Sequence, residues 1–355
     1  MKAAIIGTSG HIDLALEVRD RMPQLTFVGV APGSADEDAR EFYVDQLEAS
    51  LIPFYDDYRR MLDRETPDLA VVAPFFFLQS RIAAECLERG IHVFVEKPMA
   101  VSLEQLERLR RAHAQGKAAL CPMLSYRYHP AFHAAWRAIR DGLIGEPLLM
   151  SAQKSYKLGT RHPMYTHRAT YGGTIPWVAI HAIDWIYWFS GGRLTEATAA
   201  HTQAGNRGHG EMESAGSCFY RLANGGSATV SVDYFRPGGA PTHGDDRVRV
   251  AGEKGIVEVV NGEAVLLTHD AAPRRLEKEE PLSLFQEFVR SIEEKTPLRI
   301  SATEAFAITE IALRTREAAD TRAPVSLRAA PAGTERTDGA GAVPLARSTG
   351  TPRAG

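Results

Sequence analysis

The chain has 355 residues, of which 44% are hydrophobic and 24% are charged, a composition typical of an ordinary globular protein. This length accommodates two domains of about 150 residues each. The net charge is -3 and no predicted helix carries a basic stripe, which argues against a nucleic-acid-binding protein. The most apolar window, residues 172–190, contains Pro176, His181 and Asp184. It therefore predicts a core helix, and we expect no membrane span.

The cysteines predict a reducing compartment. Cys86, Cys121 and Cys218 are far apart, odd in number and form no C-x-x-C pair, so we expect free thiols. No signal-peptide pattern precedes the first predicted strand. We therefore expect a cytoplasmic protein.

Residues 1–123 alternate between strand and helix patterns. Helices are predicted from Ile12 to about Arg21, around residues 82–87, and from the cap residue Ser102. Six apolar runs are predicted to be strands: 3–6, 25–30, a weaker one at 51–54, 69–73, 93–95 and 118–121. Strands that alternate with helices of this length predict an α/β fold, a doubly wound parallel sheet with right-handed crossovers.

Residues 124–328 have a different pattern, which predicts an α+β second domain with mainly antiparallel strands. Turn signals at Asn224-Gly225-Gly226 and Asn261-Gly262 separate neighbouring strands, as hairpins require. Strands are predicted at 148–154, 217–222, 227–234, 248–251 and 256–260, and helices at 131–140, 174–189, 282–294 and 302–320. Residues 329–355 show no periodicity and predict a disordered tail.

A candidate phosphate-binding turn, Gly7-Thr8-Ser9-Gly10-His11-Ile12, joins the first strand to the first helix. Backbone N–H groups and the helix dipole could receive a pyrophosphate there. Ser9 and Ile12 replace the second and third glycines of the G-x-G-x-x-G pattern. A plain strand–helix turn with two glycines is therefore the alternative interpretation.

The end of the second strand does not distinguish NAD from NADP. An acid at this place would hold the adenosine ribose of NAD, but Ala31 is followed by no acid until Asp36. Ser34 and Arg40 could instead accept a 2′-phosphate, although Arg40 is also an ordinary helix charge. The sequence is therefore compatible with either NAD or NADP.

A lysine follows a short buried-strand pattern in His92-Val93-Phe94-Val95-Glu96-Lys97-Pro98. Ligands of open α/β sheets bind outside the carboxyl ends of the strands, so Lys97 is predicted to enter a ligand crevice. Taken alone, a lysine in such a place is more often a solvated surface group.

Together with Tyr126-Arg127-Tyr128-His129-Pro130, these motifs resemble the glucose–fructose oxidoreductase and inositol dehydrogenase family. The resemblance extends from about residue 2 to residue 327. It implies a Rossmann domain that binds NAD or NADP and a second domain with an open antiparallel sheet. It also implies a homo-oligomer, a dimer or tetramer formed through that sheet, and oxidoreduction of a sugar or polyol.

The resemblance also assigns site residues. Lys97 would bind the nicotinamide ribose and the reacting oxygen, and His181 matches the catalytic histidine. Where the family commonly reads Asp-x-Gly-x-His-x-x-Asp, this chain keeps His181 and Asp184 but has Trp177 at the first aspartate. The cofactor would be held by Gly7, Thr8, Ser9, Gly10, His11, Ile12, Ala31, Ser34, Pro74, Glu96 and Lys97.

Hydride transfer from an alcohol needs a base for the hydroxyl proton and a positive group for the developing alkoxide. We expect His181 to be the base and Lys97 the positive group. Trp177 could stack on a pyranose ring or cover the nicotinamide. Asp184 could orient the imidazole, or it could be an ion-paired acid of the core.

The segment after residue 148 offers further substrate contacts. Lys154 and Tyr156 rank first because a strand would hold them, whereas Arg161, His162 and Tyr165 could belong to a solvated loop. The histidines are too sparsely supported by other ligands to indicate a metal site.

These features predict an NAD(P)-dependent dehydrogenase acting on CH–OH groups. A non-catalytic regulator that responds to NAD(P) or sugar is the main alternative, and a cofactor-assisted lyase or hydrolase is a weaker one.

Overall fold

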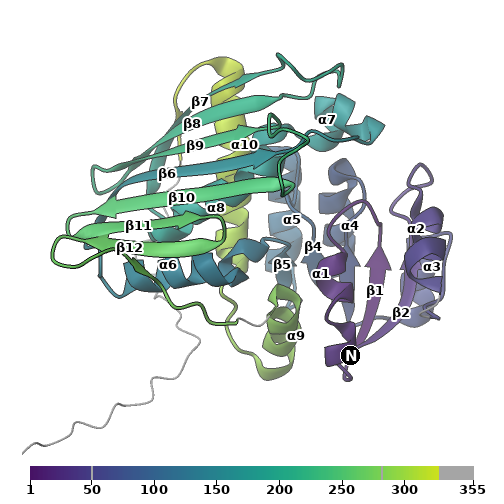
Figure 1. Cartoon of the computed structure of the whole chain (residues 1–355). Helices are drawn as coiled ribbons and strands as arrows, with labels where there is room; N and C mark the ends of the chain where they lie inside the picture. Colours follow the sequence, from purple (N-terminus) through teal and green to yellow (C-terminus); the bar gives the residue numbers. More distant parts are fainter. Residues whose placement is uncertain (49–50, 281–282, 328–355) are drawn as a thin grey trace, which may run out of the picture.

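The computed structural model describes residues 1–48, 51–280 and 283–327 (Figure 1). It contains two sheets, one on each side of a central layer of helices. Of the helices in these ranges, none has the length and apolarity needed to cross a membrane. The predicted tail, 329–355, lies outside the described residues.

The N-terminal sheet is parallel and has the strand order β2-β1-β3-β4-β5. This confirms the predicted doubly wound sheet. Its central strand β3 is fully buried, as a strand covered on both faces should be. The strands are β1 (Lys2–Ile6), β2 (Thr26–Ala31), β3 (Leu69–Val72), β4 (His92–Val95) and β5 (Leu120–Pro122).

Two local predictions in this domain are wrong. The expected strand at 51–54 contributes only an isolated bridge between Phe54 and Val30, and Pro53, with no N–H to donate, precedes it. The expected first helix is short: α1 covers Asp13–Leu16, and a separate 3₁₀ turn covers Arg19–Arg21.

The helices of this domain start where capping residues or prolines allow. Ser102 accepts a hydrogen bond from the Gln105 N–H at the start of α5, which confirms the predicted cap. The helix predicted around residues 82–87 is α4, which begins at Phe76, so Phe76, Phe77 and Leu78 form its first turn. The helices are α2 (Ala39–Gln46), α3 (Tyr58–Glu65), α4 (Phe76–Glu88) and α5 (Leu103–Gln115).

The second sheet has the order β13-β12-β11-β10-β6-β9-β8-β7-β14 and is antiparallel except for the β6–β9 pair. The predicted strands are present, and β7, β12, β13 and β14 were not predicted. The strands are β6 (Pro147–Tyr156), β7 (Leu194–Thr202), β8 (Ala215–Leu222), β9 (Ser227–Asp233), β10 (Gly244–Gly252), β11 (Gly255–Val260), β12 (Glu263–Thr268), β13 (Arg274–Arg275) and β14 (Val325–Ser326).

Helices cover one face of this sheet, between it and the Rossmann domain (Figure 1). The expected long apolar helix consists of a π-helical turn, Ile175–Ala179, followed by α8 (Ile180–Phe189). Such turns often occur at functional sites. The other helices are α6 (Pro130–Arg140), α7 (Arg168–Tyr171), α9 (Leu284–Glu294) and α10 (Ala302–Thr321).

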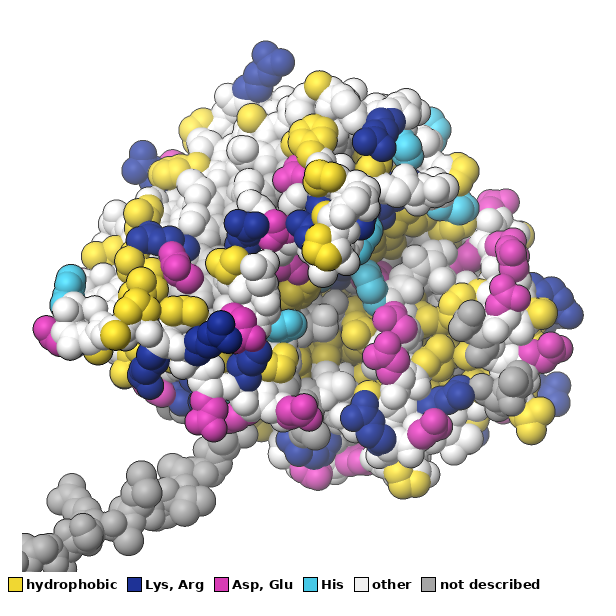
Figure 2. Space-filling model, viewed as in Figure 1, with side chains coloured by type: hydrophobic (Ala, Val, Ile, Leu, Met, Phe, Trp, Pro, Cys, Tyr) yellow, Lys and Arg dark blue, Asp and Glu magenta, His cyan; other side chains and the backbone are white. Residues whose placement is uncertain are grey.

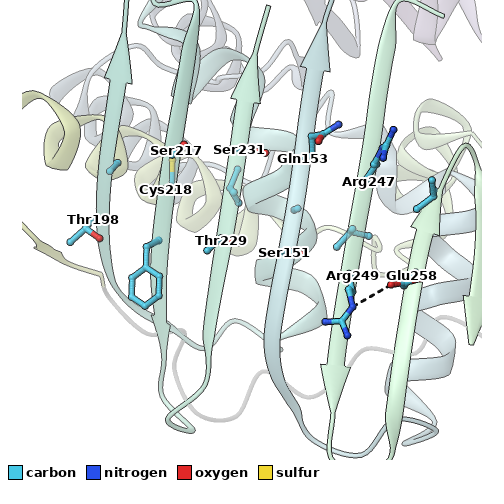
Figure 3. Close-up of a pocket in the computed structure, with 16 residues that line it drawn as sticks. Ser151, Gln153, Thr198, Ser217, Cys218, Thr229, Ser231, Arg247, Arg249 and Glu258 are labelled. Atoms are coloured by element: carbon cyan, nitrogen blue, oxygen red, sulfur yellow. Dashed lines mark ion pairs between the residues drawn. The ribbon is translucent and has the colours of Figure 1, made fainter. Parts of the chain in front are cut away.

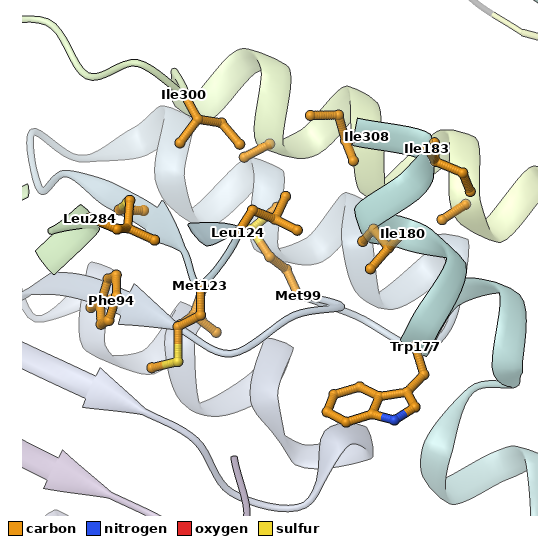
Figure 4. Packing of buried hydrophobic residues seen from close by; sticks show 14 of the residues in the cluster. Phe94, Met99, Met123, Leu124, Trp177, Ile180, Ile183, Leu284, Ile300 and Ile308 are labelled. Carbon is orange, nitrogen blue, oxygen red and sulfur yellow. The ribbon is translucent and has the colours of Figure 1, made fainter. Parts of the chain in front are cut away.

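A hydrophobic layer joins the two domains beneath the ends of β4 and β5 (Figure 4). Met99 and Leu124 lie between the Rossmann strands and Ile180 of α8, and Trp177 marks the edge of this layer. All are buried. The layer fixes the segment after β4 against the start of α8, which are the two segments that carry Lys97 and His181.

Candidate active site

The glycine turn lies at the carboxyl edge of the parallel sheet. The N–H of Gly7 donates to Ala31 O (2.8 Å) and that of Ser9 donates to Ala73 O (2.9 Å). Gly7 has φ +82°, and a Cβ there would lie 2.3 Å from backbone atoms of Pro74. The turn is therefore wedged between the ends of β2 and β3, where a ligand of an open sheet binds.

The sequence interpretation missed an acid at this turn. The carboxylate of Glu37 accepts hydrogen bonds from Thr8 N (2.7 Å), Ser9 Oγ (2.6 Å) and Gly33 N (2.7 Å). Gly33 packs closely against Pro74 and Glu37, since a Cβ there would lie 2.3 Å from Pro74 Cβ and 3.2 Å from Glu37 Oε2. Glu37 follows Asp36 in sequence, and its carboxylate reaches the turn because the loop after β2 folds back.

A second buried carboxylate meets the other end of the turn. Glu96 accepts hydrogen bonds from the backbone N–H of His11 (2.5 Å) and lies 2.7 Å from its Nδ1. A Cβ on Gly10 would lie 2.4 Å from Glu96 Oε2. Burial would raise the pKa of Glu96, but His11 and Lys97 outweigh burial and lower it, so the group is ionised.

The ammonium of Lys97 is buried under the indole of Trp177. Lys97 Nζ lies 3.3 Å from the centroid of that ring and donates to Trp177 O at 3.0 Å. Burial lowers the pKa of Lys97 to about 7; Glu96 opposes this shift, and the charges of Lys154 and Arg161 add to it. Lys97 is thus tied directly to the helical segment that carries His181.

His181 is buried and lies close to several positively charged side chains. Its Nδ1 atom has no hydrogen-bond partner in the part of the chain that the structure describes. Burial and then the positive charges of Lys97, Lys154 and His11 hold its pKa well below the usual value. The imidazole is therefore neutral near pH 7 and can accept a proton.

Lys154 enters the site from β6 as part of a network that also involves Tyr126 and Asp246. Lys154 Nζ forms an ion pair with Asp246 Oδ1 at 2.7 Å and hydrogen bonds to the Tyr126 hydroxyl, which itself donates to Asp246. Burial lowers the pKa of Lys154 to about 8, against the opposing effect of Asp246. The rings of Tyr126 and His181 are 5.1 Å apart, so this network borders the histidine.

Tyr156 lies beside the same lysine. Its ring centroid is 4.9 Å from Lys154 Nζ and 4.9 Å from the ring of His243. The predicted pair of Lys154 and Tyr156 is therefore brought together, whereas Tyr126 and Asp246 were not predicted. Asp246 is far from both in sequence, and only the β6–β10 pairing, which places it opposite Lys154, brings it near.

Asp184 forms a buried ion pair with Arg127, the arrangement expected of an ion-paired acid of the core. Its Oδ1 accepts from Arg127 Nη2 (2.8 Å) and Nε (3.0 Å), and both side chains are 1% exposed. Arg127 also binds Glu304 (2.8 Å). Oδ1 of Asp184 is thus paired with Arg127, whereas its Oδ2 has no hydrogen-bond partner among the described residues.

Aromatic rings close the site on the Rossmann side. Trp177 stacks on Phe76 with 4.1 Å between centroids and lies 6.1 Å from both His11 and Tyr165. Phe75 contacts His162 at 5.1 Å. Figure 2 shows a hollow between the two domains with hydrophobic and histidine side chains on its walls.

The other predicted cofactor residues lie near the turn. Ile12 is buried, and Ser34 has a buried hydroxyl without a hydrogen-bond partner among the described residues. Arg40, the alternative ligand for a 2′-phosphate, is 70% exposed and lies 3.9 Å from Asp56.

Similar proteins place this arrangement in a family. Residues 1–122 match the profile described as "Oxidoreductase family, NAD-binding Rossmann fold", and residues 132–258 match the "GFO/IDH/MocA C-terminal domain". A solved structure from Thermotoga maritima, provisionally classed as an oxidoreductase, is 40% identical with a TM-score of 0.88. It covers 92% of this chain, and this chain covers 100% of it.

Two more distant relatives have named substrates. Inositol 2-dehydrogenase 1 of Saccharopolyspora erythraea is 26% identical over 194 residues, which is 54% of this chain and 54% of that enzyme. Levoglucosan dehydrogenase in complex with NADH is 17% identical, with a TM-score of 0.79 over 93% of this chain and 100% of that one; at this identity the likeness concerns the fold. The chain belongs to the GFO/IDH/MocA family of oxidoreductases, with an NAD-binding Rossmann domain and the family's C-terminal domain.

Proposed function

We propose that this protein is an NAD-dependent dehydrogenase or reductase that acts on a CH–OH group of a sugar, a polyol or a related hydroxy compound. The observation that carries the proposal is the hydrogen bond from Lys97 Nζ to Trp177 O. It ties the ammonium at the end of β4 to the helical segment of His181. The relatives that act on inositol and levoglucosan support the substrate class.

The residues around the glycine turn fit a dinucleotide. The backbone N–H groups of Thr8 and His11 donate to the carboxylates of Glu37 and Glu96, so the turn presents N–H groups to anionic oxygens. Gly7 and Gly10 keep the backbone free of Cβ atoms that would clash with Pro74 and Glu96. A bound nicotinamide would supply the hydride acceptor, or the donor in the reverse direction.

Side chains from both domains would manage the proton and the developing charge. The neutral imidazole of His181 takes the hydroxyl proton as the C–O bond of the substrate becomes a carbonyl. Lys97, whose pKa is about 7, donates a hydrogen bond to the oxygen while negative charge develops on it. Tyr156 and Lys154 would contact the other hydroxyl groups, and Trp177 would present its flat ring to the apolar face of the ligand.

We propose NAD over NADP because of Glu37. Its carboxylate stands beside the end of β2 and is hydrogen bonded to Thr8 and Gly33. A carboxylate in this place binds the ribose hydroxyls of NAD and repels a 2′-phosphate. Replacing Glu37 with Ser should therefore narrow the difference in Kd between NADH and NADPH.

One observation favours a second candidate, the non-catalytic regulator. The indole of Trp177 lies directly over Lys97 Nζ, where a reacting oxygen would have to approach. A protein whose lysine stays covered would bind the cofactor without turning over a substrate.

We further propose that two copies meet through the open face of the large sheet (Figure 3). This face holds a shallow depression of about 710 Å³. Exposed apolar side chains stand on its strands, among them Leu149 and Phe219. Light scattering should show an oligomer that Phe219→Glu dissociates and that Leu51→Glu, on the Rossmann domain, leaves intact.

We also propose a domain boundary between residues 123 and 124 and a cytoplasmic location. The last strand of the parallel sheet ends at Pro122 and the first strand of the large sheet starts at Pro147. Cys86, Cys121 and Cys218 are buried free thiols, which fits a reducing compartment.

The deciding experiment combines cofactor binding and turnover. NADH and NADPH are titrated by fluorescence, and a panel of sugars and polyols is screened for a change in nicotinamide absorbance. His181→Asn should keep NADH binding and lower turnover by about 10²–10⁴-fold, while His269→Asn, at an exposed position, should match the wild type. Binding without turnover on a broad panel would support the regulator instead, and no binding of either cofactor would refute both.

A further inference from the structure

The substrate side of the site carries more positive than negative charge. Three cationic side chains gather there from the end of β4, from β6 and from the loop after β6: Lys97, Lys154 and Arg161. The two carboxylates beside them are already engaged. Glu96, which binds His11, also acts on Lys97 by opposing the fall of its pKa, and Asp246 binds Lys154, so among the described residues one of the three cations has no neighbouring carboxylate.

Arg161 is that cation. It forms no ion pair with a carboxylate in ranges 1–48, 51–280 and 283–327, and one of its Nη atoms donates to Lys157 O at 3.2 Å. Its Nε atom is buried and has no hydrogen-bond partner among the same residues. A buried donor without a partner is costly, so this arrangement favours a ligand oxygen at that position.

Two aromatic rings lie beside the guanidinium of Arg161. Its carbon lies 4.8 Å from the ring centroid of Tyr234 and 5.7 Å from that of Tyr165. The Tyr165 ring is 6.1 Å from Trp177, whose indole covers Lys97 Nζ. The rings of Tyr165 and Trp177, which are tilted by 60°, thus link Arg161 to Lys97, and the charge of Arg161 is one of those that lower the pKa of Lys97 after burial itself.

We infer that the substrate is an acid, a sugar acid or polyhydroxy acid whose carboxylate binds Arg161 while its reacting carbon faces His181 and Lys97. A planar guanidinium binds carboxylate through two parallel hydrogen bonds, whereas an uncharged polyol needs no unpaired cation. The inference rests on the proposed dehydrogenase function. The cofactor's pyrophosphate is the other anion that could be bound, although Arg161 belongs to the second domain and the glycine turn to the first.

The test compares matched acids and neutral compounds. Gluconate and glucuronate are titrated calorimetrically against glucitol and glucose, with the full chain both free and saturated with NADH. The acids should bind at least about tenfold more tightly than their neutral counterparts, since a hydrogen bond to a charged group contributes that much. Arg161→Gln should weaken the binding of the acids by about 10–100-fold and leave the neutral compounds and NADH within about twofold.

Two further variants and two outcomes complete the test. Arg161→Lys should restore part of the affinity for acids, and Arg21→Gln, which removes an exposed charge from the Rossmann domain, should change nothing. Equal affinity for acids and neutral compounds overturns the inference. Loss of NADH affinity in Arg161→Gln, with the acids unaffected, assigns the guanidinium to the pyrophosphate and also overturns it. If the chain does not bind NADH but still prefers acids to neutral compounds, the proposed dehydrogenase function is refuted. The carboxylate-binding site at Arg161 is then still supported.

Discussion

Removing the buried partner of Asp184 tests whether this acid stabilises the fold or serves the chemistry. Arg127→Met keeps the length and apolar stem of the side chain but leaves Asp184 buried without its counter-charge. Breaking a buried ion pair from one side costs about 3–5 kcal/mol. Both partners are 1% exposed, and Arg127 also neutralises Glu304, so we expect the upper part of that range.

Thermal unfolding followed by circular dichroism measures this loss. For a domain of about 200 residues, 3–5 kcal/mol corresponds to a fall in Tm of about 6–20 °C. Arg111→Met is the matched control, because Arg111 is 70% exposed and pairs with Glu107 on the surface of α5. Such a pair contributes less than about 1 kcal/mol. The double variant Arg127→Met with Asp184→Leu should recover most of the lost stability, since it leaves no unpaired charge at this pair.

The pH dependence of Arg127→Met gives a second measurement. Burial raises the pKa of Asp184 in the native chain, and Arg127 opposes that rise. Without Arg127 the folded-state pKa moves further above the unfolded value, so the folded variant binds more protons than the unfolded chain between the two values. Its stability should therefore fall as the pH rises through this window. A wild-type Tm for Arg127→Met, together with a large loss of kcat in Asp184→Asn, would contradict a structural role. It would instead indicate that Asp184 takes part in the reaction.

Two other predictions concern Lys97 and the glycine turn. Burial lowers the pKa of Lys97 to about 7 against the opposing charge of Glu96. The pKa of a lysine in the unfolded chain is about 10.4. Between these two pH values the unfolded chain therefore binds more protons than the folded chain. The wild-type free energy of unfolding should thus rise with pH across this window relative to that of Lys97→Met. Urea denaturation at a series of pH values measures this difference. A difference in unfolding free energy that stays constant with pH would contradict the burial of Lys97. Gly7→Ala should destabilise the chain more than Gly90→Ala. Both glycines have positive φ, but only at Gly7 would a Cβ lie 2.3 Å from Pro74. Equal Tm values for the two variants would show that the turn has room for a side chain.

The sequence predicted the parts of the site that depend on one local pattern. A strand pattern ending in Glu96-Lys97-Pro98 places the lysine at the sheet edge wherever the strand lies in a parallel sheet, and the structure has it there. The glycine turn was equally local. The strand β7 was missed because Leu194–Thr202 is rich in Ala and Thr and has a weak alternation of buried and exposed residues.

Contacts between distant segments could not be predicted. Glu37 reaches Thr8 across a loop that folds back, and Asp184 finds Arg127 at a separation of 57 residues. Tyr126, Lys154 and Asp246 come from three segments, and only the sheet register brings the last two together. These partners decide the roles of the predicted residues, so the sequence located the site better than it assigned its chemistry.

The tryptophan at position 177 and the surplus positive charge have one physical origin. An aspartate, which the family commonly has at this position, would place a carboxylate beside Lys97 and neutralise it. The centroid of the Trp177 indole lies 3.3 Å from Lys97 Nζ. Such a cation–π contact stabilises the ammonium by about 2 kcal/mol when water is excluded. The indole nevertheless contributes no negative charge. The cations of the site, Lys97, Lys154 and Arg161, therefore keep a net positive charge that a neutral sugar would leave uncompensated. A ligand that brings its own carboxylate would balance it, so the exchange of aspartate for tryptophan is more consistent with a change of substrate than with a loss of catalysis.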